Sequence, residues 1–551
     1  MKGAADGPGP DPGADQPPLS PSRQAPASFP RAPIAPPPPA TPVLAVVGAG
    51  PAGVAAAVAA ADGGVPVVLL LDSGPRPGGQ IHRRPAPALA TTGPRPRHHP
   101  TWTRLLQRLW AHRRRGRIRW LPGLHLWSVE HGEGGFTLHA LDGDDRPTTL
   151  TAPALLLATG AAERVLPFPG WTLPGVVTAG GAQAMLKGGL ALPGRRIVVA
   201  GTGPLLLPVA TALASAGAAV AALVESADPR TYVRHAPVLV RHPAKLAEAA
   251  GYGLRLARHR VPVLTRHSVR AAEGDGRIAS VTLAPVGGGA VRRVECDALA
   301  VGHGLLPRTE VAAALGCRTT PGGVVADARQ RTDVPGVWAA GEICGIGGAS
   351  LARAEGEIAG RDAAAWLAGA PSRRRARALW SRARLRRFAS VLDQVHPPDS
   401  APCRSLPDDT VVCRCEEVTA GRIRRAVDEL GATDARTVKL LTRAGMGWCQ
   451  GRICGPGVAA VAGTGPETVR RPFDRPVPLA VLARLDPSGP SGPPSPSDFS
   501  DPSDFSCPSG DRQGTPRRAA ERLDTPDPHT PGPHTPDANT THRPAHPQEP
   551  R

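Results

Sequence analysis

VLAVVGAGPAG, residues 43–53, is an apolar run that ends in a Gly-x-Gly-x-x-Gly loop. An alanine-rich helical stretch follows, and a second apolar run, from Val65 to Leu71, ends at Asp72. A strand, a glycine loop, a helix, a second strand and a terminal acid occur in this order in dinucleotide-binding units. The stretch therefore predicts an α/β fold that begins with such a unit.

Each part of the loop has a physical task in holding a dinucleotide. Gly48 makes the tight turn, Gly50 lets the backbone approach a pyrophosphate, and Gly53 lets the helix pack against the strand. The N–H groups at the start of the helix hold the phosphates, and Asp72 accepts a hydrogen bond from a ribose hydroxyl. The predicted contacts of this first site are Gly48, Gly50, Pro51, Ala52, Gly53 and Asp72.

Three downstream stretches favour FAD as the dinucleotide. The first is Gly78-Gly79-Gln80, and the second is an apolar run, residues 155–160, that ends at Thr159-Gly160. The third, TDVPGVWAAGE at residues 332–342, resembles the second FAD signature of flavoproteins with a thioredoxin-reductase-like fold. The contacts predicted from these stretches are Gly79, Gln80, Thr159, Gly160, Gly341 and Glu342.

The resemblance assigns a role to the third stretch. Glu342 would hydrogen-bond the ribityl chain or a nearby phosphate through water. Position 342 more often holds Asp in such proteins. The helix that begins near Ala349 would direct its positive end at the flavin pyrimidine and stabilise the charge of a reduced flavin.

A second dinucleotide-like unit is inserted between the FAD stretches. IVVAGTGPLL, residues 197–206, precedes a helical stretch and a strand that ends at Glu225. Leu206 stands where a third glycine is expected, so its side chain should push the helix away from the strand. Glu225 would favour NAD over NADP. Two interpretations stay open: NAD(P) binding, which Leu206 makes doubtful, and a Rossmann fold kept for packing and partner docking.

The cysteines exclude one activity and suggest another. No cysteine precedes Cys296, so the redox Cys-x-x-Cys of a thioredoxin reductase is excluded. Four of the nine cysteines form two late pairs, Cys413-x-Cys415 and Cys449-x4-Cys454. Two short helices, at residues 419–430 and 435–441, are predicted between the pairs and fold the second pair back onto the first. Four thiolates suit zinc or a [2Fe–2S] cluster.

Two stretches decide between these metals by resemblance. CRCEEVT at residues 413–419 and TRAGMGWCQGRIC at residues 442–454 resemble the bacterioferritin-associated-ferredoxin-like domain. The resemblance implies a [2Fe–2S] cluster held by Cys413, Cys415, Cys449 and Cys454.

The ordered part of the chain, taken as a whole, also resembles a known family. Residues 43–480 resemble a family that contains the B subunit of hydrogen cyanide synthase, the A subunit of opine oxidase, and the alpha subunits of hydroxyproline and related amino-acid dehydrogenases. The resemblance implies that the partner is an amino-acid-oxidase-like flavoprotein subunit, often joined by a small [2Fe–2S] subunit. It also implies an amine or amino acid as substrate.

Composition bounds the remaining possibilities. The net charge is +19, yet only four of the 65 basic residues are lysine and no nucleic-acid-binding motif accompanies them, so no nucleic-acid partner is expected. No apolar run has the roughly 20 residues of a membrane span. A cytoplasmic protein is expected, and peripheral attachment to the inner face of the membrane stays open.

These observations predict six segments. Residues 1–41 and 486–551 are rich in proline and small polar residues and are expected to be disordered. The FAD domain is assigned to residues 43–190 and 300–369, and the second Rossmann-like domain to residues 191–299. A basic helical connector spans residues 370–408, and the [2Fe–2S] domain spans residues 409–485.

The connector contains apolar positions at helical spacing. They predict an amphipathic helix that packs on the core, with docking to an acidic partner or an anionic membrane as the alternative. The positions are Ala376, Leu379, Trp380, Ala383 and Phe388.

The sequence therefore favours the electron-relay subunit of an amine or amino-acid dehydrogenase complex, with FAD and a [2Fe–2S] cluster. The first rival is a stand-alone NAD(P)H-dependent FAD reductase that passes electrons through the cluster, and the second is a redox-inert scaffold. No catalytic acid, base or nucleophile is assigned. His303, alone in a turn, is interpreted as structural.

Overall fold

The computed structural model describes residues 43–85, 89, 100–132, 134–372, 376–465 and 473–483. The two segments predicted to be disordered, residues 1–41 and 486–551, lie outside the described residues, and so does Cys507.

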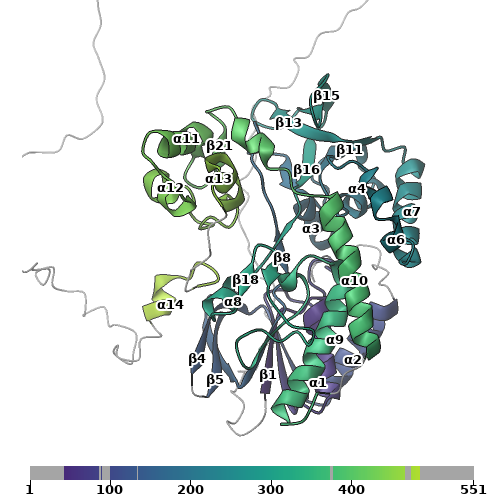
Figure 1. Cartoon of the computed structure of the whole chain (residues 1–551), viewed down its shortest axis with the longest axis vertical. Coiled ribbons are helices and arrows are strands. Elements are labelled where there is room, and N and C mark those ends of the chain that lie inside the picture. Colours follow the sequence, from purple (N-terminus) through teal and green to yellow (C-terminus); the bar gives the residue numbers. More distant parts are fainter. Residues whose placement is uncertain are drawn as a thin grey trace, which may run out of the picture. The chain divides into compact units, whose positions relative to one another are not determined.

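The first glycine-loop unit opens a five-stranded parallel sheet (Figure 1). The predicted apolar runs form its central strands, which are buried because helices and a second sheet cover the two faces. The strands, in spatial order, are β20 (Val337–Ala339), β7 (Ala154–Leu157), β1 (Val43–Val47), β2 (Val67–Asp72) and β3 (Ile118–Pro122). The covering helices are α1 (Pro51–Asp62), α2 (Pro100–Arg114) and α9 (Gly348–Leu367). The antiparallel sheet consists of β4 (His125–Gly132), β5 (Gly135–Leu141) and β6 (Pro147–Ala152).

Helices α1 and α9 approach each other at backbone distance. A Cβ on Gly356 would lie 2.0 Å from the Ala52 carbonyl oxygen, and one on Gly360 would lie 2.1 Å from that of Ala56. These glycines therefore bring the start of α9 close to the glycine loop at the start of α1.

The second unit forms another five-stranded parallel sheet. Its spatial order is β12 (Val263–Thr265), β11 (Ala219–Glu225), β10 (Arg196–Gly201), β16 (Ala298–Gly302) and β9 (Val176–Thr178). One face packs on α3 (Ala179–Gly189), α4 (Leu206–Ser215) and α7 (Pro243–Arg258). The other face packs on an antiparallel sheet of β13 (His267–Glu273), β14 (Ser280–Pro285) and β15 (Arg292–Glu295). The predicted α/β class with two dinucleotide-type domains is confirmed.

The chain passes from the first sheet to the second, and back again, at positions that differ from the predicted domain boundaries. Strand β9 and helix α3, within predicted residues 43–190, belong to the layers of the second sheet, and so does all of β16. The short strand β9 was missed because it has no glycine-loop signal and gains its partner only from β16, far along the chain.

The connector forms helix α10 (Ala376–Val395), which lies alongside α9 (Figure 1). Its buried residues are Ala389, Val391 and Val395. Trp380, expected to pack on the core, is 64% exposed, with the Arg384 guanidinium over its ring. The expected apolar face was therefore wrong at this position, because arginines of the same helix make the inward contacts, as described below.

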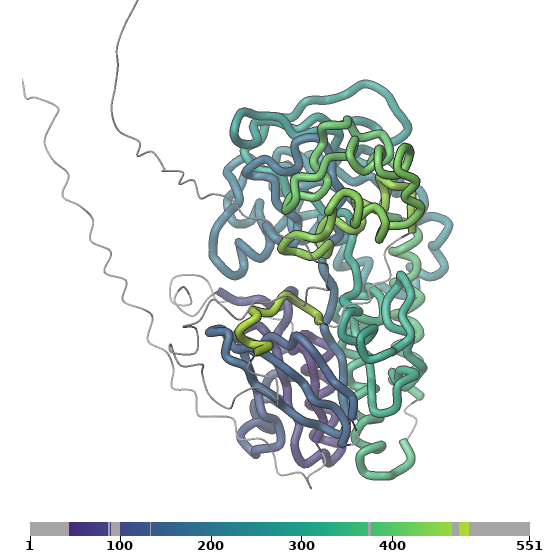
Figure 2. Tube along the Cα trace, turned by 90° about the vertical axis from the view of Figure 1, so that its left-hand side faces the viewer, coloured from purple at the N-terminus to yellow at the C-terminus, as the bar shows by residue number. Residues whose placement is uncertain are grey.

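The cysteine-rich segment forms a small helical group, drawn in green in Figures 1 and 2. The predicted helices between the cysteine pairs are confirmed as α11 (Ala420–Asp428) and α12 (Ala435–Thr442). Helix α13 (Gly455–Ala462) and the pair β21 (Val411–Cys413) and β22 (Val418–Thr419) complete the group.

The remaining elements are short. They are β8 (Ala161–Glu163) paired with β17 (Leu305–Pro307), β18 (Thr319–Thr320) paired with β19 (Gly323–Val324), α5 (Thr231–Arg234), α6 (Ala236–Leu239), α8 (Glu310–Ala314), α14 (Leu479–Ala483), and the 3₁₀ turns Glu342–Cys344 and Ala401–Ser405. Within the described ranges, no helix combines the length and apolarity that crossing a bilayer requires.

Candidate cofactor sites

The first glycine loop has the shape that a bound pyrophosphate requires. A Cβ on Gly53 would lie 1.7 Å from the Gly48 carbonyl oxygen, so the helix start lies directly against the strand end. A Cβ on Gly50, by contrast, would meet nothing within 4 Å. Gly50 is also the N-cap of α1 and offers no side-chain acceptor, so the first N–H groups of α1 stay available for an anion. The loop therefore fits the pyrophosphate of a dinucleotide.

Asp72 holds this loop in place. One of its carboxylate oxygens accepts from the Ala49 N–H at 2.6 Å, and the other accepts from the Gly74 N–H at 2.6 Å. Burial raises the pKa of Asp72, although these two N–H groups oppose the shift. Each oxygen keeps a second lone pair. The ribose contact of Asp72 stays a prediction.

The other predicted FAD residues meet the loop from three directions. The Gly78 N–H donates to the Ala49 carbonyl at 2.8 Å, which lays the Gly78–Gln80 turn on the loop. A Cβ on Gly79 would lie 3.1 Å from the Gly50 Cα, and one on Gly341 would lie 2.7 Å from the Ala52 Cβ. The fold thus brings residues from sequence positions near 50, 80 and 341 to one end of the first sheet.

Two further predicted residues follow strand β7 at the same end of the sheet. The Thr159 hydroxyl donates to the Arg308 carbonyl at 2.8 Å, and the Arg308 N–H donates to the Gly160 carbonyl at 3.0 Å. A Cβ on Gly160 would meet nothing within 4 Å. Gln80 accepts from the Arg83 side chain at 2.7 Å.

A buried carboxylate that the sequence did not reveal lies against the second FAD signature. Glu355 on α9 is fully buried, and it accepts from the Gly341 N–H at 3.1 Å. Two connector arginines, Arg382 and Arg386, pair with it, and Arg386 also donates to the Gly345 carbonyl at 3.1 Å. The only sequence signal was that acids, Glu355 and Asp362, fall among the small residues of α9. Glu355 therefore ties α10 to the turn that carries the predicted flavin contacts.

Glu342 itself lies in the turn that precedes α9. Burial raises its pKa, and the Gly348 N–H donates to it and opposes the shift. The helix predicted near Ala349 begins at Gly348, as expected. The water-mediated contact with FAD stays a prediction.

The second glycine loop differs from the first at its helix. Helix α4 begins at Leu206, after a longer turn than the one that separates Gly48 from α1. The Leu206 side chain is buried in the core below α4, and its Cδ2 lies 3.2 Å from the position of a Cβ on Gly302. The first N–H groups of α4 are therefore set back from the loop.

Four cysteines meet in the small helical group. The Cys449 thiol lies within hydrogen-bonding reach of Cys415 and Cys454, and Cys454 lies within reach of Cys413. The four thiols are free, and Cys415 is exposed while Cys413 and Cys454 are buried. Burial and the neighbouring sulfurs Cys413 and Cys449 raise the pKa of Cys454.

Backbone N–H groups point at these sulfurs. The Gly445 N–H donates to the Cys413 sulfur at 3.5 Å, and the Gly451 N–H donates to Cys449. Burial opposes ionisation of Cys449, yet the N–H groups of Ile453, Gly451 and Cys454 lower its pKa. Such donors stabilise thiolates and tune the potential of iron–sulfur clusters. The donor set therefore fits a cluster with four thiolate ligands.

In the part of the chain that the structure describes, no group of three or more His, Cys, Asp or Glu side chains is arranged to hold a single metal ion. A [2Fe–2S] cluster makes a different demand, because its four thiolates are shared between two irons. The pairwise contacts of the four cysteines are of this kind.

A short segment of the second domain anchors the helical group, and sequence reasoning missed it. The Trp171 indole donates to the Val411 carbonyl at 2.6 Å, two residues before Cys413. Leu166 packs in the core of the group, and the Cys403 thiol lies 3.8 Å from the Pro167 carbonyl oxygen. The only sequence signal was the aromatic and proline content of residues 166–171.

The other singled-out residues are structural in character. His303 is half-buried, and its Nδ1 accepts from the Leu166 N–H at 3.3 Å. Burial, with Arg164 nearby, lowers the pKa of His303 to about 4, so the ring is neutral at physiological pH. Cys296 and Cys317 are buried, and burial raises the pKa of each thiol. Burial raises the pKa of Cys344 to about 12.

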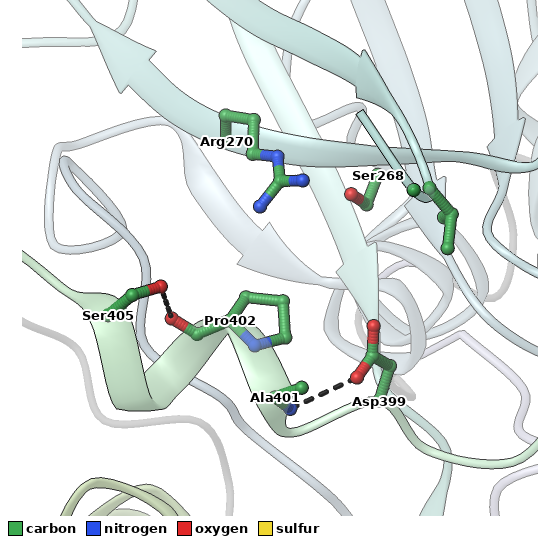
Figure 3. Close-up of a pocket in the computed structure, with 8 residues that line it drawn as sticks. Ser268, Arg270, Asp399, Ala401, Pro402 and Ser405 are labelled. Carbon is green, nitrogen blue, oxygen red and sulfur yellow. Dashed lines mark hydrogen bonds between the residues drawn. The ribbon is translucent and has the colours of Figure 1, made fainter. Parts of the chain in front are cut away.

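Two surface hollows lie away from these sites. The first, of about 260 Å³, lies between β13 and the segment that follows α10; Ser268, Arg270 and Asp399 are among its lining residues (Figure 3). Asp399 is already bonded to the Ala401 N–H at 3.0 Å. The second, of about 740 Å³, lies beside β15. Neither contains a predicted site residue.

Comparison with known families agrees with the two-part architecture. Residues 42–356 match the model of the pyridine nucleotide-disulphide oxidoreductases, and residues 411–462 match that of the BFD-like [2Fe-2S] binding domain.

Individual relatives match over most of their length. The chain is 36% identical to hydrogen cyanide synthase subunit HcnB of Pseudomonas aeruginosa, over 74% of this chain and 89% of the relative. It is 33% identical to the A subunit of opine oxidase from Rhizobium meliloti, over 76% of this chain and 83% of the relative. Among solved structures, L-proline dehydrogenase from P. horikoshii matches with a TM-score of 0.56 and 19% identity, over 81% of this chain and 80% of that one. This last likeness concerns the fold alone.

Proposed function

Because the chain belongs to the pyridine nucleotide-disulphide oxidoreductase family and ends in a BFD-like [2Fe-2S] binding domain, we propose that it is the FAD-containing electron-relay subunit of an amine or amino-acid dehydrogenase complex. One observation carries the proposal: the same chain holds a pyrophosphate-shaped loop in its first domain and four adjacent cysteines in a helical group that the Trp171 contact fixes on its second domain. Bound FAD would take two electrons from a donor, and the cluster would pass them on singly.

The residues of the first site would bind and orient the flavin. The Gly50 backbone and the start of α1 would hold the pyrophosphate, while Asp72 keeps the loop closed and accepts from the ribose. Gly341, Glu342 and the start of α9 would face the flavin end, where the helix dipole favours the charge of the reduced ring.

The residues of the second site would hold the cluster and leave one edge accessible. Cys413 and Cys454 are buried, whereas Cys415 is exposed and Trp448, beside Cys449, is 85% exposed. An accessible edge permits electron transfer to or from another protein.

The donor would be a second flavoprotein subunit that oxidises the carbon–nitrogen bond of an amine or amino acid. Support comes from the relatives, which are named as subunits of hydrogen cyanide synthase and of opine oxidase. A small [2Fe–2S] subunit is a further proposed member of the complex.

The second candidate function is a stand-alone NAD(P)H-dependent reductase. The observation in its favour is that Gly203 still faces open space and that Glu225 still ends strand β11. Leu206 and the late start of α4 disfavour it.

Anaerobic stopped-flow mixing separates the two functions. We expect the isolated chain to keep its flavin oxidised on mixing with NADH. The complex purified through a tag on this chain should lose flavin absorbance when opines, proline, hydroxyproline or glycine are added in turn. Bleaching of the isolated chain by NADH within a catalytic turnover time would reject the relay function in favour of the reductase.

A further inference from the structure

Three side chains meet at the carboxyl end of the second parallel sheet: Glu225, His396 and Tyr232. The His396 Nδ1 lies 3.4 Å from a carboxylate oxygen of Glu225, and the His396 Nε2 lies 2.7 Å from the Tyr232 hydroxyl. The His396 side chain is 9% exposed and that of Glu225 is 16% exposed. The three groups thus form a buried polar chain.

Glu225 occupies the position whose carboxylate binds the adenosine ribose in dinucleotide-binding units. Its two oxygens accept backbone N–H groups as those of Asp72 do, and the contact that distinguishes Glu225 is the one with His396. One accepts from the Gly203 N–H at 3.0 Å, and the other accepts from the Ala227 N–H at 3.0 Å and faces His396. Burial opposes ionisation, but His396 and these N–H groups lower the pKa of Glu225. His396 therefore lies against the carboxylate that would bind a ribose.

The connector helix delivers His396 to this place. His396 directly follows α10, and its N–H donates to the Leu392 carbonyl at 2.9 Å. Two residues of α10 contact the second domain. The Phe388 ring packs on the His242 ring, with the ring centroids 4.9 Å apart, and Arg384 donates to the Arg241 carbonyl at 3.2 Å. The contacts of Arg382 and Arg386 with Glu355 fix the same helix on the FAD domain. Such attachment at both domains makes displacement of His396 costly.

We propose that His396 blocks the second dinucleotide site, so that the connector, together with Leu206, sets the specificity of this chain against nicotinamide dinucleotides. The inference rests on the proposed function in one respect: a closed second site requires that electrons reach the flavin from a partner protein. It adds a specificity-determining residue that lies outside both glycine loops.

The test measures binding rather than turnover. Because Leu206 is a separate obstacle, the comparison is made in the Leu206→Gly background with the full chain. Isothermal titration calorimetry with NADH, and separately with ADP-ribose, gives the affinity of L206G, of L206G/H396A and of L206G/H259A. His259 is the matched control, since it is an exposed histidine in the same domain, at the end of α7, whose ring lies 3.5 Å from the Ser215 hydroxyl.

We expect removal of His396 to tighten binding of both probes at least about tenfold relative to L206G, because Glu225 regains a free ribose-facing lone pair. The His259 control should match L206G. A Tyr232→Phe change in the same background removes only one hydroxyl and should give a smaller gain in affinity. This variant tests the proposal even if H396A disturbs the fold.

Equal affinity of L206G and L206G/H396A, or no binding by either, would overturn the proposal. The relay function is judged separately, by flavin reduction with amine or amino-acid substrates in the complex, so the two can fail independently.

Discussion

Gly50 illustrates what one residue contributes to the first site. Its missing side chain leaves open space above the loop, and its backbone conformation is ordinary for an L-residue. A substitution there should leave the fold intact and fill only the ligand position. Gly50 is therefore required for binding, whereas Gly48 and Gly53 are required for folding because of their close contacts.

Gly50→Glu is predicted to abolish FAD binding, because a carboxylate would occupy the pyrophosphate position. The measurement is the ratio of released flavin to protein after purification. Gly143→Glu is the matched control, since Gly143 also meets nothing within 4 Å and lies in the turn between β5 and β6. If the Gly50 variant retains stoichiometric flavin, the site is misplaced.

His303 makes a prediction about pH. Its pKa is about 4 in the folded protein and 6.5 in the unfolded reference, so the unfolded chain binds more protons between these values. Stability from this group is therefore present above pH 6.5 and is lost as the pH falls toward 4. Between pH 7.5 and 5.5 the loss should be about 1.4 kcal/mol of unfolding free energy.

His303→Asn keeps an acceptor for the Leu166 N–H but cannot titrate. Urea unfolding at the two pH values should show a smaller pH dependence for the variant than for the parent. Identical pH dependence in both proteins would refute the neutral assignment.

At the scale of elements, helix α10 gains its position from buried charge rather than from an apolar stripe. Arg382 and Arg386 point at Glu355, and Trp380 faces solvent. The alternative interpretation, docking of the arginine-rich face to an acidic partner, therefore loses two of its arginines, which pair with Glu355 instead. Periodicity could predict the helix but not its orientation, because the acid that orients it lies on another helix.

Glu355→Ala is predicted to lower the free energy of unfolding by about 3 kcal/mol, since it leaves two partly buried guanidinium groups without their partner. Glu357→Ala on the same helix is the matched control, because its pairs with Arg353 and Arg361 are more exposed and contribute less than about 1 kcal/mol. Chemical denaturation of the purified proteins measures both. Equal losses in the two variants would show that the buried pair does not hold α10.

At the scale of the whole molecule, the sequence predicted the elements that have a pattern in neighbouring residues. Apolar runs and glycine loops identified β1, β2, β7, β10 and β11, and cysteine spacing identified the helical group. Contacts between distant segments escaped prediction, because no local pattern records them. Trp171 and Val411 are 240 positions apart, and His396 reaches Glu225 only because α10 spans both domains.

The same limit applies to the sites. The residues for the first dinucleotide and for the cluster could be named from motifs whose chemistry is local in sequence. Glu355 and His396 could not, since each is an ordinary residue made functional by its neighbours in space.

The central claim is that one chain combines a flavin and a [2Fe–2S] cluster in a single electron path. Anaerobic titration with dithionite, followed by visible absorption and electron paramagnetic resonance, tests it most directly. We predict uptake of about three electrons per chain, two by FAD and one by the cluster. Cys413→Ser should lower the uptake to about two, and Cys403→Ser should leave it unchanged. Uptake of about two electrons by the parent protein, with zinc in place of iron and no paramagnetic signal, would contradict the claim.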